Sequence, residues 1–239
     1  MSNIGIDYVK NADKYYQPKT PFSTLKAVTD GLLPPEAFIY KASSIDPIAD
    51  NPENLEEIER ILGQKNRDLK TNLLLKQILD KLIKHPDKEI ALFAAESINA
   101  IENEYNRAVE KLEKDGHRKR ALLYTELAEL NRDVTDLRNF YLREAFAGYR
   151  KLQTAGEAGD EDLLNMSRIL IGLNMLSPAA KILYSNKIKG IEARLIMAEI
   201  AFRQRNYTRL YFLMADLDKH RSRLNSEQTE LIDFWMEGI

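Results

Sequence analysis

The feature that most constrains this chain is the scarcity of proline and glycine after residue 53. Beyond that point the only prolines are Pro86 and Pro178. The whole chain of 239 residues has 8 prolines and 10 glycines. Both residue types destabilise helix interiors, so a long stretch nearly free of them is typical of successive helices. Apolar residues there are spaced by three and four, as along Leu69–Ile83, with no sustained alternation of apolar and polar residues. We therefore predict an all-α protein without β-sheet.

Local signals predict where the helices begin and end. Asn51-Pro52-Glu53 is a start signal, with a capping residue, proline at the first helical position and an acid in the first turn. Gly63 ends that helix, and His85-Pro86-Asp87 separates the next two. The later helices are expected at about 90–115, 121–130, 137–152, 163–176, from Pro178, 188–203, 208–217 and from Ser226. Helices joined by short turns should pack antiparallel as hairpins.

Residues 1–52 differ from the rest because they contain six of the eight prolines. Their apolar residues occur in short pieces, which predicts an irregular N-terminal arm with one short helix near Ser23–Thr29. Such an arm either packs on its own domain, docks on a partner or remains disordered.

The amino-acid composition and the absence of known motifs exclude several classes of function. The absence of cysteine excludes disulfides, thiolate metal sites and thiol catalysis, and it fits a cytoplasmic location. The three histidines, His85, His117 and His220, lack the spacing of a helical metal site. No phosphate-binding loop, dinucleotide fingerprint or nucleophile elbow occurs. We therefore expect no catalytic residue, no metal and no cofactor.

The sequence also predicts neither a membrane span nor a signal peptide. The first residues lack a basic segment followed by an apolar core. The longest uncharged run, Ile169–Ala180, is shorter than the roughly 20 apolar residues that a spanning helix needs. The net charge of −2 argues against bulk nucleic-acid binding.

Several segments resemble known helical repeats. Leu69–Ile101 resembles a HEAT repeat, with an apolar helix, a His-Pro-Asp break and a second helix that carries small residues. Gly190–Asp218 resembles a single TPR, with Ala198 at its small-residue position. Arg205 and Leu210 depart from the TPR pattern, which expects Gly and Ala there. Weaker copies are 163–184 and 121–152, although the second does not fit the repeat of about 34 residues.

These resemblances imply a right-handed α-solenoid of antiparallel hairpins. Its parts would be the N-terminal arm at 1–52, HEAT-like hairpins at 53–115 and TPR-like repeats at 116–239. The order also resembles the cytoplasmic helical part of PelE-type proteins, which belong to bacterial exopolysaccharide export machines. The membrane helices of that family have no counterpart in this sequence. This resemblance implies an accessory role in a cell-envelope or polysaccharide export assembly.

The charged residues point to binding rather than to catalysis. Glu96 and Glu199 stand among small or apolar residues, so each is expected to be part-buried and paired with an arginine of the next helix, such as Arg194 or Arg203. Basic residues cluster at 117–120 and 203–223, where they oppose helix dipoles or bind an acidic partner, anionic lipid heads or RNA. The aromatic residues interleaved with the second cluster are expected in the core: Tyr207, Tyr211 and Phe212.

We predict a non-catalytic scaffold that binds another protein in a concave groove. The first helix of each TPR-like pair should face that groove, and arginine holds carboxylates through two hydrogen bonds. The candidate partner-binding residues are Arg194, Arg203, Arg205 and Arg209. One alternative is a protein that binds nucleic acid or anionic lipid through the basic clusters, with only peripheral membrane contact. A second is an enzyme with an unrecognised helical active site.

Overall fold

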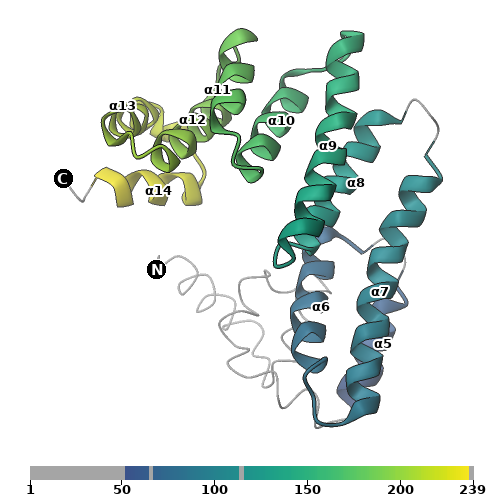
Figure 1. Ribbon diagram of the computed structural model, residues 1–239. Coiled ribbons are helices and arrows are strands. Elements are labelled where there is room, and N and C mark those ends of the chain that lie inside the picture. The colour runs from purple at the N-terminus through teal and green to yellow at the C-terminus, as the bar shows by residue number, and fades with distance from the viewer. Residues whose placement is uncertain (1–51, 65–66, 113–115, 237–239) are drawn as a thin grey trace. The chain divides into compact units, whose positions relative to one another are not determined.

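The computed structural model describes residues 52–64, 67–112 and 116–236 (Figure 1). Within these ranges the chain forms ten α-helices and one short 3-10 helix, without a strand, so the all-α prediction is confirmed. Of the predicted N-terminal arm only Pro52 falls inside the described residues, and the helix expected near Ser23–Thr29 lies outside them. No helix among the described residues is both long and apolar enough to cross a bilayer. The chain divides into two units, 1–110 and 111–239.

The first unit contains α5 (Pro52–Leu62), α6 (Leu69–Leu82) and α7 (Lys88–Glu110). Asp68 caps the start of α6, and its side chain accepts a hydrogen bond from the Thr71 N–H. Helices α6 and α7 pack against each other. The buried residues follow the predicted spacing and include the small Ala94 of α7: Leu74, Leu75, Ile78, Leu79 and Leu82 on α6, and Ala94, Ile101 and Tyr105 on α7.

A buried arginine connects the three helices of this unit. Arg67 lies just before α6, and only 2% of its side chain is exposed. Its guanidinium donates hydrogen bonds to the backbone carbonyls of Leu62 and Gln64 at the end of α5. It also donates to Asn72 Oδ1 of α6, at 2.9 Å, and to the Glu104 carboxylate of α7. One side chain therefore caps α5 and joins it to α6 and α7.

Replacing Arg67 should destabilise the protein far more than replacing its acidic partner. Arg67→Ala leaves buried Asn72 and the two α5 carbonyls without their donor, so we expect a loss of about 3 kcal/mol in the free energy of unfolding. Glu104 is 53% exposed, so Glu104→Gln should cost under about 1 kcal/mol. Urea unfolding of both variants tests this, and similar small losses would contradict the central role of Arg67.

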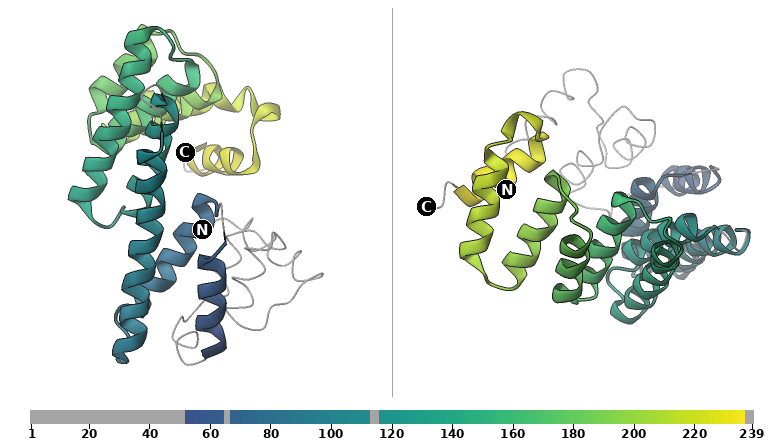
Figure 2. Two further views of the ribbon diagram at one scale, coloured as in Figure 1. Left: turned by 90° about the vertical axis from the view of Figure 1, so that its right-hand side faces the viewer. Right: turned by 90° about the horizontal axis from the view of Figure 1, so that it is seen from above.

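The second unit contains seven α-helices that pack on one another in succession: α8 (His117–Leu130), α9 (Thr135–Ala155), α10 (Asp160–Gly172), α11 (Leu176–Ser185), α12 (Ile191–Arg203), α13 (Tyr207–Asp218) and α14 (Ser226–Met236). The 3-10 helix Arg221–Arg223 precedes α14. Helix α12 contacts α10 as well as α11 and α13. Helices α9 to α13 follow one another in chain order across Figure 1, and the second view in Figure 2 shows the same order from teal to yellow.

Four successive helices of this unit, α9 to α12, end in the same way. Each has a residue in the left-handed conformation after its last turn, namely Gly156, Asn174, Lys187 and Arg205. The backbone N–H of that residue and of the next one bond back to carbonyls of the last turn, as Arg205 does to Phe202 and Asn206 to Ala201. This arrangement is a Schellman motif, in which glycine is the usual left-handed residue. Three of the four positions carry a side chain instead.

Glycine at position 205 should therefore stabilise the fold. Arg205 has φ +56°, which brings its Cβ close to the backbone, and glycine removes this contact. Arg205→Gly should raise the free energy of unfolding by up to about 1 kcal/mol after the entropy cost of glycine. Gln204→Gly is the matched control, because Gln204 is right-handed at φ −81° and should lose stability. Thermal melting of both variants checks the opposite signs.

Candidate functional site

The second unit contains a partly buried ion pair between Arg118 and Asp162, at the starts of α8 and α10. Arg118 Nε and Nη2 donate to the two carboxylate oxygens of Asp162 at 2.9 and 2.8 Å. Asp162 also accepts from the Gly159 N–H, and Arg118 donates to the Glu157 carbonyl. The hydrogen bond from Arg118 holds the pKa of Asp162 below its usual value of 3.8. These hydrogen bonds join the starts of two helices, so we assign the pair a structural role.

Two features of the described part of the chain bear on metal binding and catalysis: the grouping of side chains that could bind a metal, and a tyrosine with a shifted pKa. No group of three or more His, Asp or Glu residues there could hold a metal ion. Burial raises the pKa of Tyr149, whose hydroxyl accepts a long hydrogen bond from Asn165. This tyrosine is buried on α9, close enough to Asp162, Glu161 and Arg118 for their charges to act on its hydroxyl.

The four predicted partner-binding arginines occupy three different places. Arg194 Nε pairs with Asp216 Oδ2 of α13 at 2.8 Å. Arg203 Nη2 pairs with Glu199 Oε1, one turn earlier in α12, also at 2.8 Å. Arg205 lies in the α12–α13 turn. Arg209 stacks over the ring of Tyr184, 5.4 Å from its centre.

Arg194 and Arg209 meet at a pocket between α11, α12 and α13, which we call the cationic pocket. It has a volume of about 190 Å³ and a largely apolar lining. Its lining residues are Leu183, Tyr184, Ile188, Lys189, Gly190, Ala193, Arg194, Met197, Arg209 and Leu213. Three of them are cationic and none is acidic. The structure thus brings two of the four predicted arginines together and adds Lys189.

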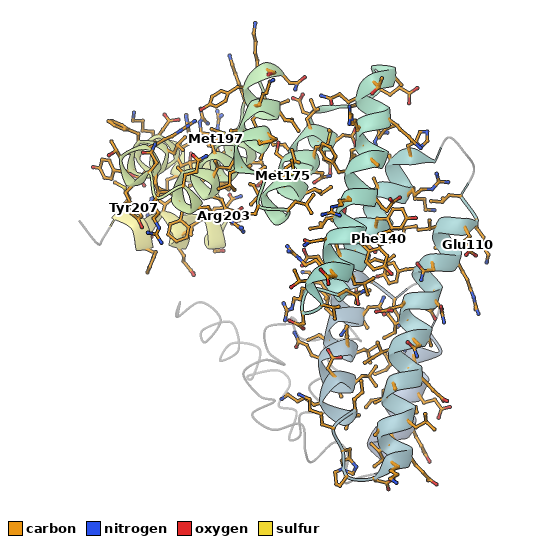
Figure 3. All side chains as sticks on the ribbon, viewed as in Figure 1. Glu110, Phe140, Met175, Met197, Arg203 and Tyr207 are labelled. Carbon is orange, nitrogen blue, oxygen red and sulfur yellow. The ribbon has the colours of Figure 1, made fainter. Side chains whose placement is uncertain are left out.

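A larger hollow lies along a different face of α12, and we call it the apolar groove. It has a volume of about 420 Å³. Its lining residues are Arg168 of α10, Glu192, Leu195, Ile196, Ala198, Glu199 and Phe202 of α12, Leu210 and Met214 of α13, and Leu231 of α14. Figure 3 labels Met197, which lines the cationic pocket, and Arg203, which pairs with a residue of the groove.

Each charged residue of the apolar groove has a partner of opposite charge. Arg168 of α10 donates to Glu192, whose other carboxylate oxygen accepts from Gln228 of α14 at 3.1 Å. Glu199 accepts from Arg203. The exposed apolar side chains between these pairs are Phe202, at 47% exposure, and Leu231, at 43%. The groove therefore presents apolar surface inside a charge-balanced rim.

Two predictions about individual side chains are wrong. Glu96 and Glu199 are exposed rather than part-buried, and Glu199 pairs within its own helix because Arg203 lies one turn away on the same face. Tyr207, Tyr211 and Phe212 are exposed rather than in the core. The buried side of α13 carries Leu210, Met214 and Leu217, and the three aromatic residues lie outside that stripe. Figure 3 labels Tyr207, the first residue of α13.

The sequence predicted a groove beside the first helix of each TPR-like pair, but not the apolar residues that line this one. In the sequence, the groove corresponds to a stripe of α12 residues spaced by three, four and three: Glu192, Leu195, Glu199 and Phe202. In this stripe apolar residues share one helix face with acidic residues. Almost every residue of α12 between these positions is apolar, so no single polar face stands out.

No family model matches the chain, and no curated protein or solved structure is significantly similar to it. The resemblance to PelE-type proteins therefore has no family match to support it.

The Arg118–Asp162 pair should make stability depend on pH at the acidic end. The pKa of Asp162 is lowered by folding, so its contribution is complete above about pH 5 and is lost as pH falls below its usual pKa of 3.8. Asp162→Asn should lower the free energy of unfolding at neutral pH, and the deficit should shrink below about pH 4. Asp160→Asn, an exposed acid in the same helical turn, is the control. Denaturant titrations between pH 3 and pH 7 measure the difference, and a pH-independent deficit would contradict the pairing.

Proposed function

We propose that this chain is a non-catalytic protein-interaction module that binds a segment of another protein in the apolar groove. The observation that carries the proposal is the exposure of Phe202 and Leu231 on two helices that face one hollow of 420 Å³. Exposed apolar side chains gathered around a hollow and rimmed by polar groups are typical of protein-binding sites.

The packing of the second unit supports a repeat architecture for this module. We propose that α10 with α11 and α12 with α13 are antiparallel hairpins stacked as a right-handed solenoid, with α14 opening a further pair. Support comes from α12, which packs on both α10 and α11, as a repeat does on its predecessor. The shared helix ends of α10, α11 and α12 are a second repeating feature. In this arrangement α10, α12 and α14 are the first helices of their pairs and line the groove.

The chemistry of the groove favours a partner segment with apolar side chains on one face, such as an amphipathic helix. Such a helix places residues three and four apart on one side, which matches a hollow that runs along a helix. Because Arg168 already pairs with Glu192, and Glu199 with Arg203, binding would rest on apolar burial rather than on charge. None of the four predicted arginines lines this groove, although Arg203 pairs with Glu199, which does.

Substitutions in the groove should weaken capture of the native partner. Burial of one large apolar side chain contributes about 1.5–3 kcal/mol, so Phe202→Asp or Leu231→Asp should weaken binding by roughly tenfold or more. Phe212→Asp is the matched control, because Phe212 is 68% exposed on α13 and does not line the groove. A pull-down from the native host with quantitative mass spectrometry compares the variants, after circular dichroism confirms equal helix content. Undiminished capture by both folded groove variants would contradict the proposal.

A further inference from the structure

The cationic pocket combines an apolar floor with a volume that suits one side chain. Leu183, Met197 and Leu213 belong to or pack against the core formed by α10, α11 and α12, and they also line the pocket. Its volume of about 190 Å³ exceeds the roughly 150 Å³ of an apolar cavity known to accept benzene. One aromatic or branched aliphatic side chain therefore fits it.

The charges around this pocket are unbalanced, unlike those of the apolar groove. Lys189, Arg194 and Arg209 line it, and no acidic residue does. Asp216 of α13 pairs with Arg194 and offsets one of the three positive charges. Arg209 is stacked on Tyr184, which orients its planar guanidinium without neutralising it. The rim thus has a net charge of about +2 beside an apolar recess, and the complementary ligand is anionic with an apolar group.

We infer that the cationic pocket binds an acidic peptide segment of a partner protein, in which one large apolar side chain is flanked by Asp or Glu. The apolar side chain enters the recess, and the flanking carboxylates pair with Arg209 and Lys189. A membrane surface fits this site poorly, because a recess offers lipid no protruding apolar group. The inference is independent of the proposed function, since the pocket and the groove share no lining residue.

The test uses the full chain and a fluorescein-labelled peptide, Gly-Ser-Asp-Asp-Phe-Asp-Asp-Ser-Gly, in fluorescence anisotropy titrations. We expect saturable binding that weakens as salt rises, because salt screens the exposed charges. A second peptide with Ala in place of Phe should bind at least about fivefold more weakly, since it leaves the recess empty.

Three variants locate the site. Arg209→Gln should weaken binding about tenfold, through loss of a charge-assisted hydrogen bond. Arg205→Gln is the matched control, because it removes the same charge four residues away in the turn and should leave binding unchanged. Asp216→Asn should tighten binding about threefold, because it releases Arg194 from its internal partner. A purely structural role for Arg194 and Asp216 predicts no gain. Thermal melting confirms that each variant is folded.

Several results would overturn the inference. They are the absence of binding at about 1 mM peptide, equal weakening by Arg209→Gln and Arg205→Gln, and equal affinity for the Phe and Ala peptides. The inference would also be overturned if inorganic phosphate displaced the labelled peptide as effectively as unlabelled peptide does, because the surface would then be a general anion site. If Phe202→Asp and Leu231→Asp leave the affinity for the peptide unchanged, the cationic pocket acts separately from the groove of the proposed function.

Discussion

Burial of α12 along two sides at once is the constraint that organises the second unit. Ile196 and Ile200 enter a core shared with α10 and α11, while Ala198 and Ala201 enter a core shared with α13 and α14. The small residues on the second side allow close approach of the neighbouring helix. Residues of α12 also line two hollows, the cationic pocket and the apolar groove. Both candidate binding surfaces thus form where α12 meets its neighbours.

The two hollows differ in chemistry because of how their charges are paired. In the apolar groove Arg168, Glu192 and Glu199 all have partners of opposite charge, so the surface is nearly neutral and its apolar residues dominate. In the cationic pocket two arginines arrive from different helices, and only one of them meets a carboxylate. One helix therefore separates an apolar surface from a charged one. The two hollows share no lining residue.

The helices were predictable from the sequence because proline, glycine and apolar spacing are local signals. The start of α8 at His117 was placed too late, at 121, because its first turn is basic and carries no apolar residue. The burial of Arg67 could not be predicted from the sequence, since a charged residue is usually exposed and its partner Glu104 is 37 positions away. The arginines were identified as a group, but the angle of about 100° per residue sends Arg194 and Arg203 to different faces of α12. Only the packing of α11 and α13 brings Arg194 to Arg209.

The Schellman helix ends have a consequence for proteolysis. Lys187 and Arg205 are trypsin sites in exposed turns, where cleavage normally starts. In both cases the amide beyond the cleavage point is already hydrogen-bonded, from the Ile188 N–H to the Leu183 carbonyl and from the Asn206 N–H to the Ala201 carbonyl. A protease must extend the chain to reach these bonds, so the last turn of α11 or α12 has to unwind first. The rate of nicking at these two turns therefore reports the opening of helix ends beside the two hollows.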